Sequence, residues 1–184
     1  MRELGRGFID LDSILITHFH GDHISGLPGL LLSLSNYGRT AALTIAGPKG
    51  VESVVNSLRV IAPELQFPIR FKELAFDSGA PIDFRLGDFH ISALPLRHGI
   101  PCIGYSLYIP RAGKFDAARA KRLNIPLKLW SRLQNGEAAD GVTSDRVLGP
   151  QRQGIKVRYI TETLSVENIH AFNPGPDPLN SDGT

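Results

Sequence analysis

The sequence predicts an α/β fold, and three observations support this prediction. Short apolar runs bounded by glycine, proline and polar residues recur along the chain, as is typical of buried strands. Between several of them, apolar residues recur at the three- and four-residue spacing of an amphipathic helix. The predicted strands do not alternate strictly with the predicted helices.

The predicted elements follow in order from these runs. Pro28 is compatible with a helix only in its first turn, and Pro63 ends a second helix. The first five elements are a strand at 14–17, a leucine-rich helix at 27–34, a strand at 42–46, a helix at 51–61 and a strand at 69–74. The later elements are strands at 82–84, 89–94 and 103–109, a helix at 115–123, a strand at 157–160 and a short helix at 166–172. The tail from 173 to 184 is rich in Pro, Gly, Asp and Asn and has no core pattern.

Composition excludes several classes of protein. The 184 residues, 42% of them hydrophobic, suit one domain with a sizeable core. No run of 18 apolar residues indicates a membrane span, and no apolar segment follows the N-terminal charges as in a signal peptide. The single cysteine, Cys102, excludes an internal disulfide and fits a reducing cytoplasm. The net charge of +2 says nothing about nucleic acid.

Three of the six histidines fall in the run Thr17-His18-Phe19-His20-Gly21-Asp22-His23, directly after an apolar strand. Imidazole and carboxylate are ligands that Zn²⁺ favours. His18 and His20 are two residues apart, so on an extended chain they point to the same side and can hold one ion. Asp22 and His23 follow Gly21, whose backbone freedom would let a tight turn direct them toward a second ion.

Two further residues stand where predicted strands end. His98 follows the strand at 89–94 and is the natural third ligand beside His18 and His20. Glu162 follows the strand at 157–160, where its carboxylate could bridge two metals; the alternative is an exposed loop glutamate. His90 and His170 are expected to be packing or surface residues, and Cys102 a small buried one.

Such a site supports hydrolysis. Two divalent ions about 4 Å apart lower the pKa of a bridging water and neutralise charge on a scissile phosphoryl group. The Asp22 carboxylate could orient or deprotonate that water.

Basic residues gather in the segment between Arg111 and Leu133, where Asp116 is the one acidic residue. They are Arg111, Lys114, Arg119, Lys121, Arg122, Lys128 and Arg132. A second basic group follows at Arg146, Arg152, Lys156 and Arg158. The pattern alone leaves open a solvated helix face or a patch that contacts phosphates.

The run from His18 to His23 matches the His-x-His-x-Asp-His signature of the metallo-β-lactamase superfamily. Its extension from Ile24 to Leu31 resembles the ribonuclease Z family, endonucleases that remove the 3′ trailer from precursor tRNA. The resemblance spans nearly the whole chain, with further matching segments at 43–50, 98–105, 113–116, 125–126, 133–137 and 147–150.

The resemblance implies a metallo-β-lactamase αβ/βα sandwich in a single domain, 1–184, with a basic substrate-binding arm inserted at about 111–145. It implies that His18, His20 and His98 hold one zinc, while Asp22 and His23 hold a second, with Asp22 also the general base. It further implies a cytoplasmic homodimer whose arm residues, Arg111 to Arg132, grip precursor tRNA.

The chain also departs from the family. The family has N-terminal strands before the point where the match begins, and C-terminal segments that supply further histidines. Its bridging aspartate is replaced by Glu162 in Thr161-Glu162-Thr163. These departures predict an incomplete fold with exposed apolar surface, one complete zinc site, a partial second site and low or no activity.

Two alternatives remain open at this point. One is a different hydrolase of the same fold, acting as a phosphodiesterase, sulfatase or lactonase. The other is a non-catalytic remnant that binds metal or RNA.

Overall fold

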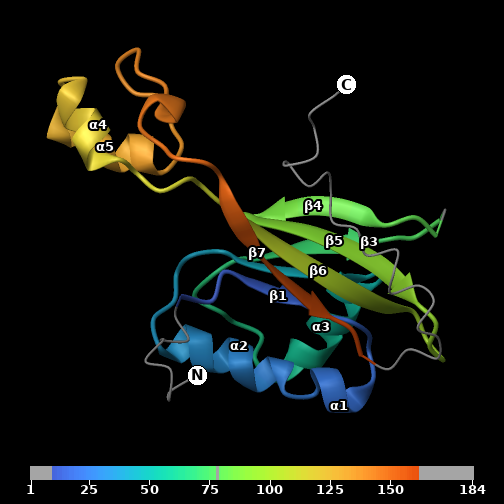
Figure 1. Ribbon diagram of the computed structural model, residues 1–184. Coiled ribbons are helices and arrows are strands. Elements are labelled where there is room, and N and C mark those ends of the chain that lie inside the picture. Colours follow the sequence, from blue (N-terminus) through green and yellow to red (C-terminus); the bar gives the residue numbers. More distant parts are fainter. Residues whose placement is uncertain (1–9, 78, 162–184) are drawn as a thin grey trace.

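The structure is a computed structural model that describes residues 10–77 and 79–161, and it contains two β-sheets (Figure 1). Sheet A has three parallel strands, in spatial order β1-β2-β3: β1 (Ser13–Leu15), β2 (Leu43–Pro48) and β3 (Ile69–Leu74). Sheet B has four antiparallel strands, in order β4-β5-β6-β7: β4 (Ile82–Leu86), β5 (Phe89–Leu96), β6 (Cys102–Arg111) and β7 (Arg152–Tyr159).

Helices cover the face of sheet A that points away from sheet B (Figure 1). They are the short α1 (Gly21–Ile24), α2 (Leu27–Asn36) and α3 (Val51–Leu58), which continues into the 3₁₀ turn η3 (Arg59–Ile61). Leucines of α2 and valines of α3 pack with Leu43 and Ile45 of β2 in one buried cluster. Burial of this apolar surface holds the helices on the sheet.

A second cluster, contributed by β5, β6 and the end of β3, packs the two sheets together. Tyr105 of β6 lies in it with 1% of its surface exposed, and its hydroxyl donates a hydrogen bond of 2.8 Å to the carbonyl of Ile16. Burial raises the pKa of the Tyr105 phenol, so the hydroxyl keeps its proton and remains a donor. This bond ties sheet B to the end of β1.

Tyr105→Phe is expected to lower the free energy of unfolding by about 1–2 kcal/mol, because the Ile16 carbonyl then loses its buried donor. Urea denaturation followed by circular dichroism measures the change. Tyr108→Phe, in the same strand but less buried, is the matched control and is expected to change stability by less than about 0.5 kcal/mol. Equal losses in the two variants would contradict this role for the Tyr105 hydroxyl.

The segment between β6 and β7 extends beyond the sheets (Figure 1), and we call residues 112–151 the arm. It contains α4 (Ala117–Arg122), α5 (Leu127–Gln134) and the 3₁₀ turn η4 (Ser144–Arg146). The Asp116 side chain caps α4 by accepting a hydrogen bond from the backbone N–H of Arg119. The arm has its own small core, formed by Ala120, Ile125, Leu129, Leu133, Ala139 and Val147.

Most of the predicted elements are present, and the main differences concern α1, α5 and β7. The expected tight turn at Gly21 is helix α1, and Gly21 does not have a positive φ. Helix α5 was not predicted, and β7 begins five residues before the predicted strand. The predicted helix at 166–172 and the tail from 173 lie outside the described residues.

The described residues form both sheets of the expected αβ/βα sandwich and the helical layer that covers sheet A (Figure 1). The expected exposed apolar surface is present on β7, where Ile155, Val157 and Tyr159 are 50–54% exposed. Within residues 10–77 and 79–161, no helix has both the length and the apolar character needed to cross a bilayer.

Candidate metal centre

His18 is held between the two sheets by the backbone that precedes it. The Ile16 N–H donates to the carbonyl of Ala46 in β2, and the Thr17 carbonyl accepts from the N–H of Ile103 in β6, at 2.8 and 2.9 Å. The His18 side chain that follows is completely buried. Because both sheets fix this segment, the position of the first histidine is determined by the fold.

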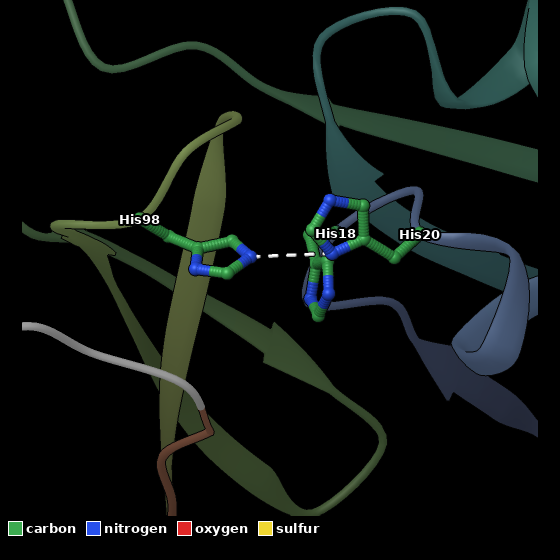
Figure 2. A group of neighbouring side chains, drawn as sticks. All are labelled: His18, His20 and His98. Carbon is green, nitrogen blue, oxygen red and sulfur yellow. Dashed lines mark hydrogen bonds between the residues drawn. The ribbon is translucent and has the colours of Figure 1, made fainter.

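His98 approaches from the other side, in the short connection between β5 and β6 (Figure 2). Leu96 pairs with Cys102 at the base of this connection, which places His98 close to its tip. The His98 Nε2 atom lies 3.2 Å from the His20 Nδ1 atom. The ring centroids of His18, His20 and His98 lie 4.7–5.0 Å from one another.

The three histidines fit one zinc ion. One ring nitrogen from each lies within 4.8 Å of the others. Two ligands of a tetrahedral zinc, each about 2.05 Å from the metal, are about 3.3 Å apart, close to the separation of His98 Nε2 and His20 Nδ1. Three imidazoles plus water is an established ligand set for catalytic zinc.

Thr17 and Cys102 also contact the buried histidine, and sequence reasoning did not assign them to the site. The Thr17 hydroxyl lies 3.0 Å from the His18 Nδ1 atom, and the Cys102 thiol lies 3.9 Å from the same atom. A hydrogen bond at Nδ1 fixes the orientation of the ring and favours Nε2 as the metal ligand. The signal for Cys102 was its position four residues after His98, directly across the β5–β6 connection.

Asp22 and His23 lie on α1, beside the three histidines but outside their converging group in the part of the chain that the structure describes. The Asp22 side chain is 77% exposed, and its carboxylate lies 3.5 Å from the His23 Nε2 atom. The His23 ring contacts the His18 ring at a tilt of 51°, with centroids 4.2 Å apart. Glu162 lies outside the described residues.

The structure also describes most of the other residues that the sequence analysis singled out. Cys102 is buried, as expected, and His90 of β5 is half-buried against Arg85 and Tyr108. All seven basic residues predicted to bind substrate are exposed, from Arg111 at the end of β6 to Arg132 in α5. Arg132 is partly engaged within the arm, where it pairs with Glu137 at 3.1 Å.

The basic residues and the histidines lie at opposite ends of β6. Cys102 begins this ten-residue strand next to His18, and Arg111 ends it at the arm. At about 3.3 Å per residue the two ends are about 30 Å apart. The arrangement can therefore combine hydrolysis at one end with electrostatic contact to a large anionic substrate at the other.

The chain is similar to several known proteins. A family model described as the beta-lactamase superfamily domain matches residues 2–115. The chain is 46% identical over 181 residues to a protein named ribonuclease Z from Agathobacter rectalis and 44% identical over 181 residues to one from Lachnoclostridium phytofermentans. Each alignment covers 96% of this chain and 59% of the relative, so the chain spans about six tenths of the length of these relatives.

Among solved structures, the human tRNase Z, short form, is similar to 55% of this chain and 45% of its own, at 29% sequence identity and a TM-score of 0.46.

Proposed function

Because the chain belongs to the beta-lactamase superfamily and has its metallo-β-lactamase fold, we propose that it is a zinc-dependent endoribonuclease that removes the 3′ trailer from precursor tRNA. The convergence of His18, His20 and His98 carries the hydrolytic part of this proposal. The relatives named ribonuclease Z support the choice of substrate, because they match almost the whole chain.

The arm also supports an RNA substrate. Its exposed Lys and Arg side chains are suited to phosphates, and they lie about 30 Å from the histidines. A small ester at the histidines would not reach them, whereas a folded RNA would. Recognition through the backbone and the shape of the RNA is typical of proteins that bind helical RNA.

His18, His20 and His98 would hold the first zinc, and Asp22, His23 and Glu162 would hold a second more weakly. Bound zinc lowers the pKa of water and neutralises charge on the scissile phosphodiester. The exposed Asp22 carboxylate would accept the proton of the attacking water. We further propose that the protein acts in the cytoplasm as a homodimer.

The test is an assay of the purified chain on precursor tRNA with a 3′ trailer, beside an aryl phosphodiester, a sulfate ester and a lactone. Slow cleavage at the trailer junction is expected, with small esters hydrolysed at least about tenfold less efficiently. A chelator should abolish the cleavage, and added zinc should restore it. Metal analysis should find one tightly held zinc per chain.

Three outcomes would contradict parts of the proposal. Faster hydrolysis of a small ester would favour another hydrolase of the same fold. Binding of zinc and tRNA without any cleavage would favour a non-catalytic role, and two tightly held zincs would refute the weak second site.

A further inference from the structure

A cavity of about 740 Å³ lies at the base of the arm, and its lining contains none of the three clustered histidines, His18, His20 and His98. One wall is the β4–β5 hairpin, with Arg85 and His90. A second wall is the end of β6 and the chain that follows it, with Arg111 and Lys114. Arg152, the first residue of β7, also lines the space. We call this space the stem cavity. Its lining joins a wall of sheet B to the arm, which no feature of the sequence indicated.

The lining of the stem cavity is positively charged. Arg85, Arg111, Lys114 and Arg152 face two acidic residues, Asp88 and Glu137. Glu137 is already paired with Arg132, at 3.1 Å, so much of its charge is neutralised within the arm. An anion in this space would therefore meet an excess of positive charge.

Two of the guanidinium groups are held by partners in the protein. Arg85 donates a hydrogen bond to the Nε2 atom of His90, which must therefore be the unprotonated nitrogen of that ring. Arg152 donates through Nε to the carbonyl of Ala112, at 2.8 Å. A guanidinium anchored in this way loses little conformational entropy when it binds an oxyanion, and its planar fork matches the oxygens of a phosphate.

We propose that the stem cavity binds a backbone phosphate of the RNA substrate, with Arg85 and Arg152 as its main contacts. This inference rests on the proposed function and adds a contact outside the basic run of the arm. The volume of the cavity suits a nucleotide unit. RNA is favoured over an acidic protein because Arg111 and Lys114 belong both to this lining and to the basic run, so one backbone can follow both.

The test compares binding of precursor tRNA to the wild-type chain and to Arg85→Gln/Arg152→Gln, by electrophoretic mobility shift between 50 and 200 mM salt. We expect the double variant to bind about tenfold more weakly at 100 mM salt. The slope of log affinity against log salt should fall by about one, because the contact with one phosphate is lost. Arg70→Gln, an exposed arginine on β3, is the matched control and should leave affinity and slope unchanged.

A second variant separates charge from geometry. Arg85→Lys/Arg152→Lys keeps both charges but removes the planar guanidinium groups. The salt slope should therefore stay near the wild-type value, while affinity falls to a level between those of the wild-type chain and the double glutamine variant. Thermal melting of each variant checks that the fold is retained.

The proposal is overturned if the double glutamine variant binds RNA with wild-type affinity and slope. Polyglutamate serves as the probe for an acidic protein. The proposal is also overturned if the double glutamine variant binds only polyglutamate more weakly than the wild-type chain does, because the cavity would then accept an acidic protein. Binding is measured apart from cleavage, so an inactive chain with the expected binding changes would refute the proposed enzymatic function alone. A wild-type chain that fails to bind RNA would refute both.

Discussion

His20→Ala is expected to lower zinc affinity by more than about 100-fold and to reduce trailer cleavage to background. Mutation of a residue that hydrogen-bonds to a metal ligand typically lowers metal affinity or activity 10- to 100-fold, so loss of the ligand itself should lower them further. His20 is preferable to His18 for this experiment, because His18 is completely buried and its removal would leave a cavity in the core. Metal content after dialysis and the rate of cleavage of precursor tRNA are the two measurements.

The control for metal content is His90→Ala, which removes a histidine at the far end of β5 and should leave zinc binding unchanged. Melting is compared in the presence of a chelator, because bound zinc itself stabilises the folded state. Zinc retained by His20→Ala would refute the three-histidine site. Zinc lost with cleavage unchanged would show that the reaction does not use this metal.

The spacing of the histidines made the first half of the site predictable. His18 and His20 stand two residues apart on extended chain after an apolar strand, and His98 follows another strand. The structure brings ring nitrogens of all three within 4.8 Å, as that pattern indicated. A strand end fixes a side chain through regular backbone geometry, so its position can be deduced from local sequence.

The positions of Asp22 and His23 were harder to deduce, because they depend on the conformation after His20. The glycine suggested a turn with unusual backbone angles, whereas the chain forms α1 with ordinary ones. Helical geometry leaves Asp22 mostly exposed, beside the histidine group. A single glycine permits many conformations and selects none.

Helix α5 was missed because its apolar residues are few and lie among lysine, arginine and serine. Leu129 and Leu133 are the buried residues of this helix, and they pack against partners as distant in sequence as Val147. The start of β7 was missed for a related reason. Its residues there are mostly exposed and polar, and they form a strand because they pair with β6. Such elements form because of tertiary contacts, and the local sequence pattern does not reveal those contacts.

The stem of the arm contains a contact that only glycine allows. The chain at Gly113 runs against the chain at Gly149, where the N–H of Gly149 donates to the carbonyl of Lys114 at 2.9 Å. A Cβ atom on Gly113 would lie 2.0 Å from the Gly149 carbonyl oxygen and 2.9 Å from that of Pro150. Both are backbone atoms, so no side-chain movement can relieve the clash.

Gly113→Ala is therefore expected to destabilise the arm by about 1–3 kcal/mol, the usual cost of overpacking. The core of the arm is small, so this loss should loosen residues 112–151 while the sheets stay folded. Limited trypsin digestion should cut the arm faster, and affinity for precursor tRNA should fall at least about tenfold. Zinc content should not change, because the histidines lie about 30 Å away along β6.

Gly149→Ala is the matched control on the other side of the same contact. Its Cβ would lie 3.5 Å from the carbonyl oxygen of Lys114, an ordinary van der Waals distance, so the arm should stay protected and tRNA affinity should be near wild-type. Equal digestion of the two variants would contradict the glycine requirement at Gly113. Loosening of the arm with tRNA affinity unchanged would show that RNA binding does not depend on the arm. Together with His20→Ala, this pair separates binding at one end of β6 from metal chemistry at the other.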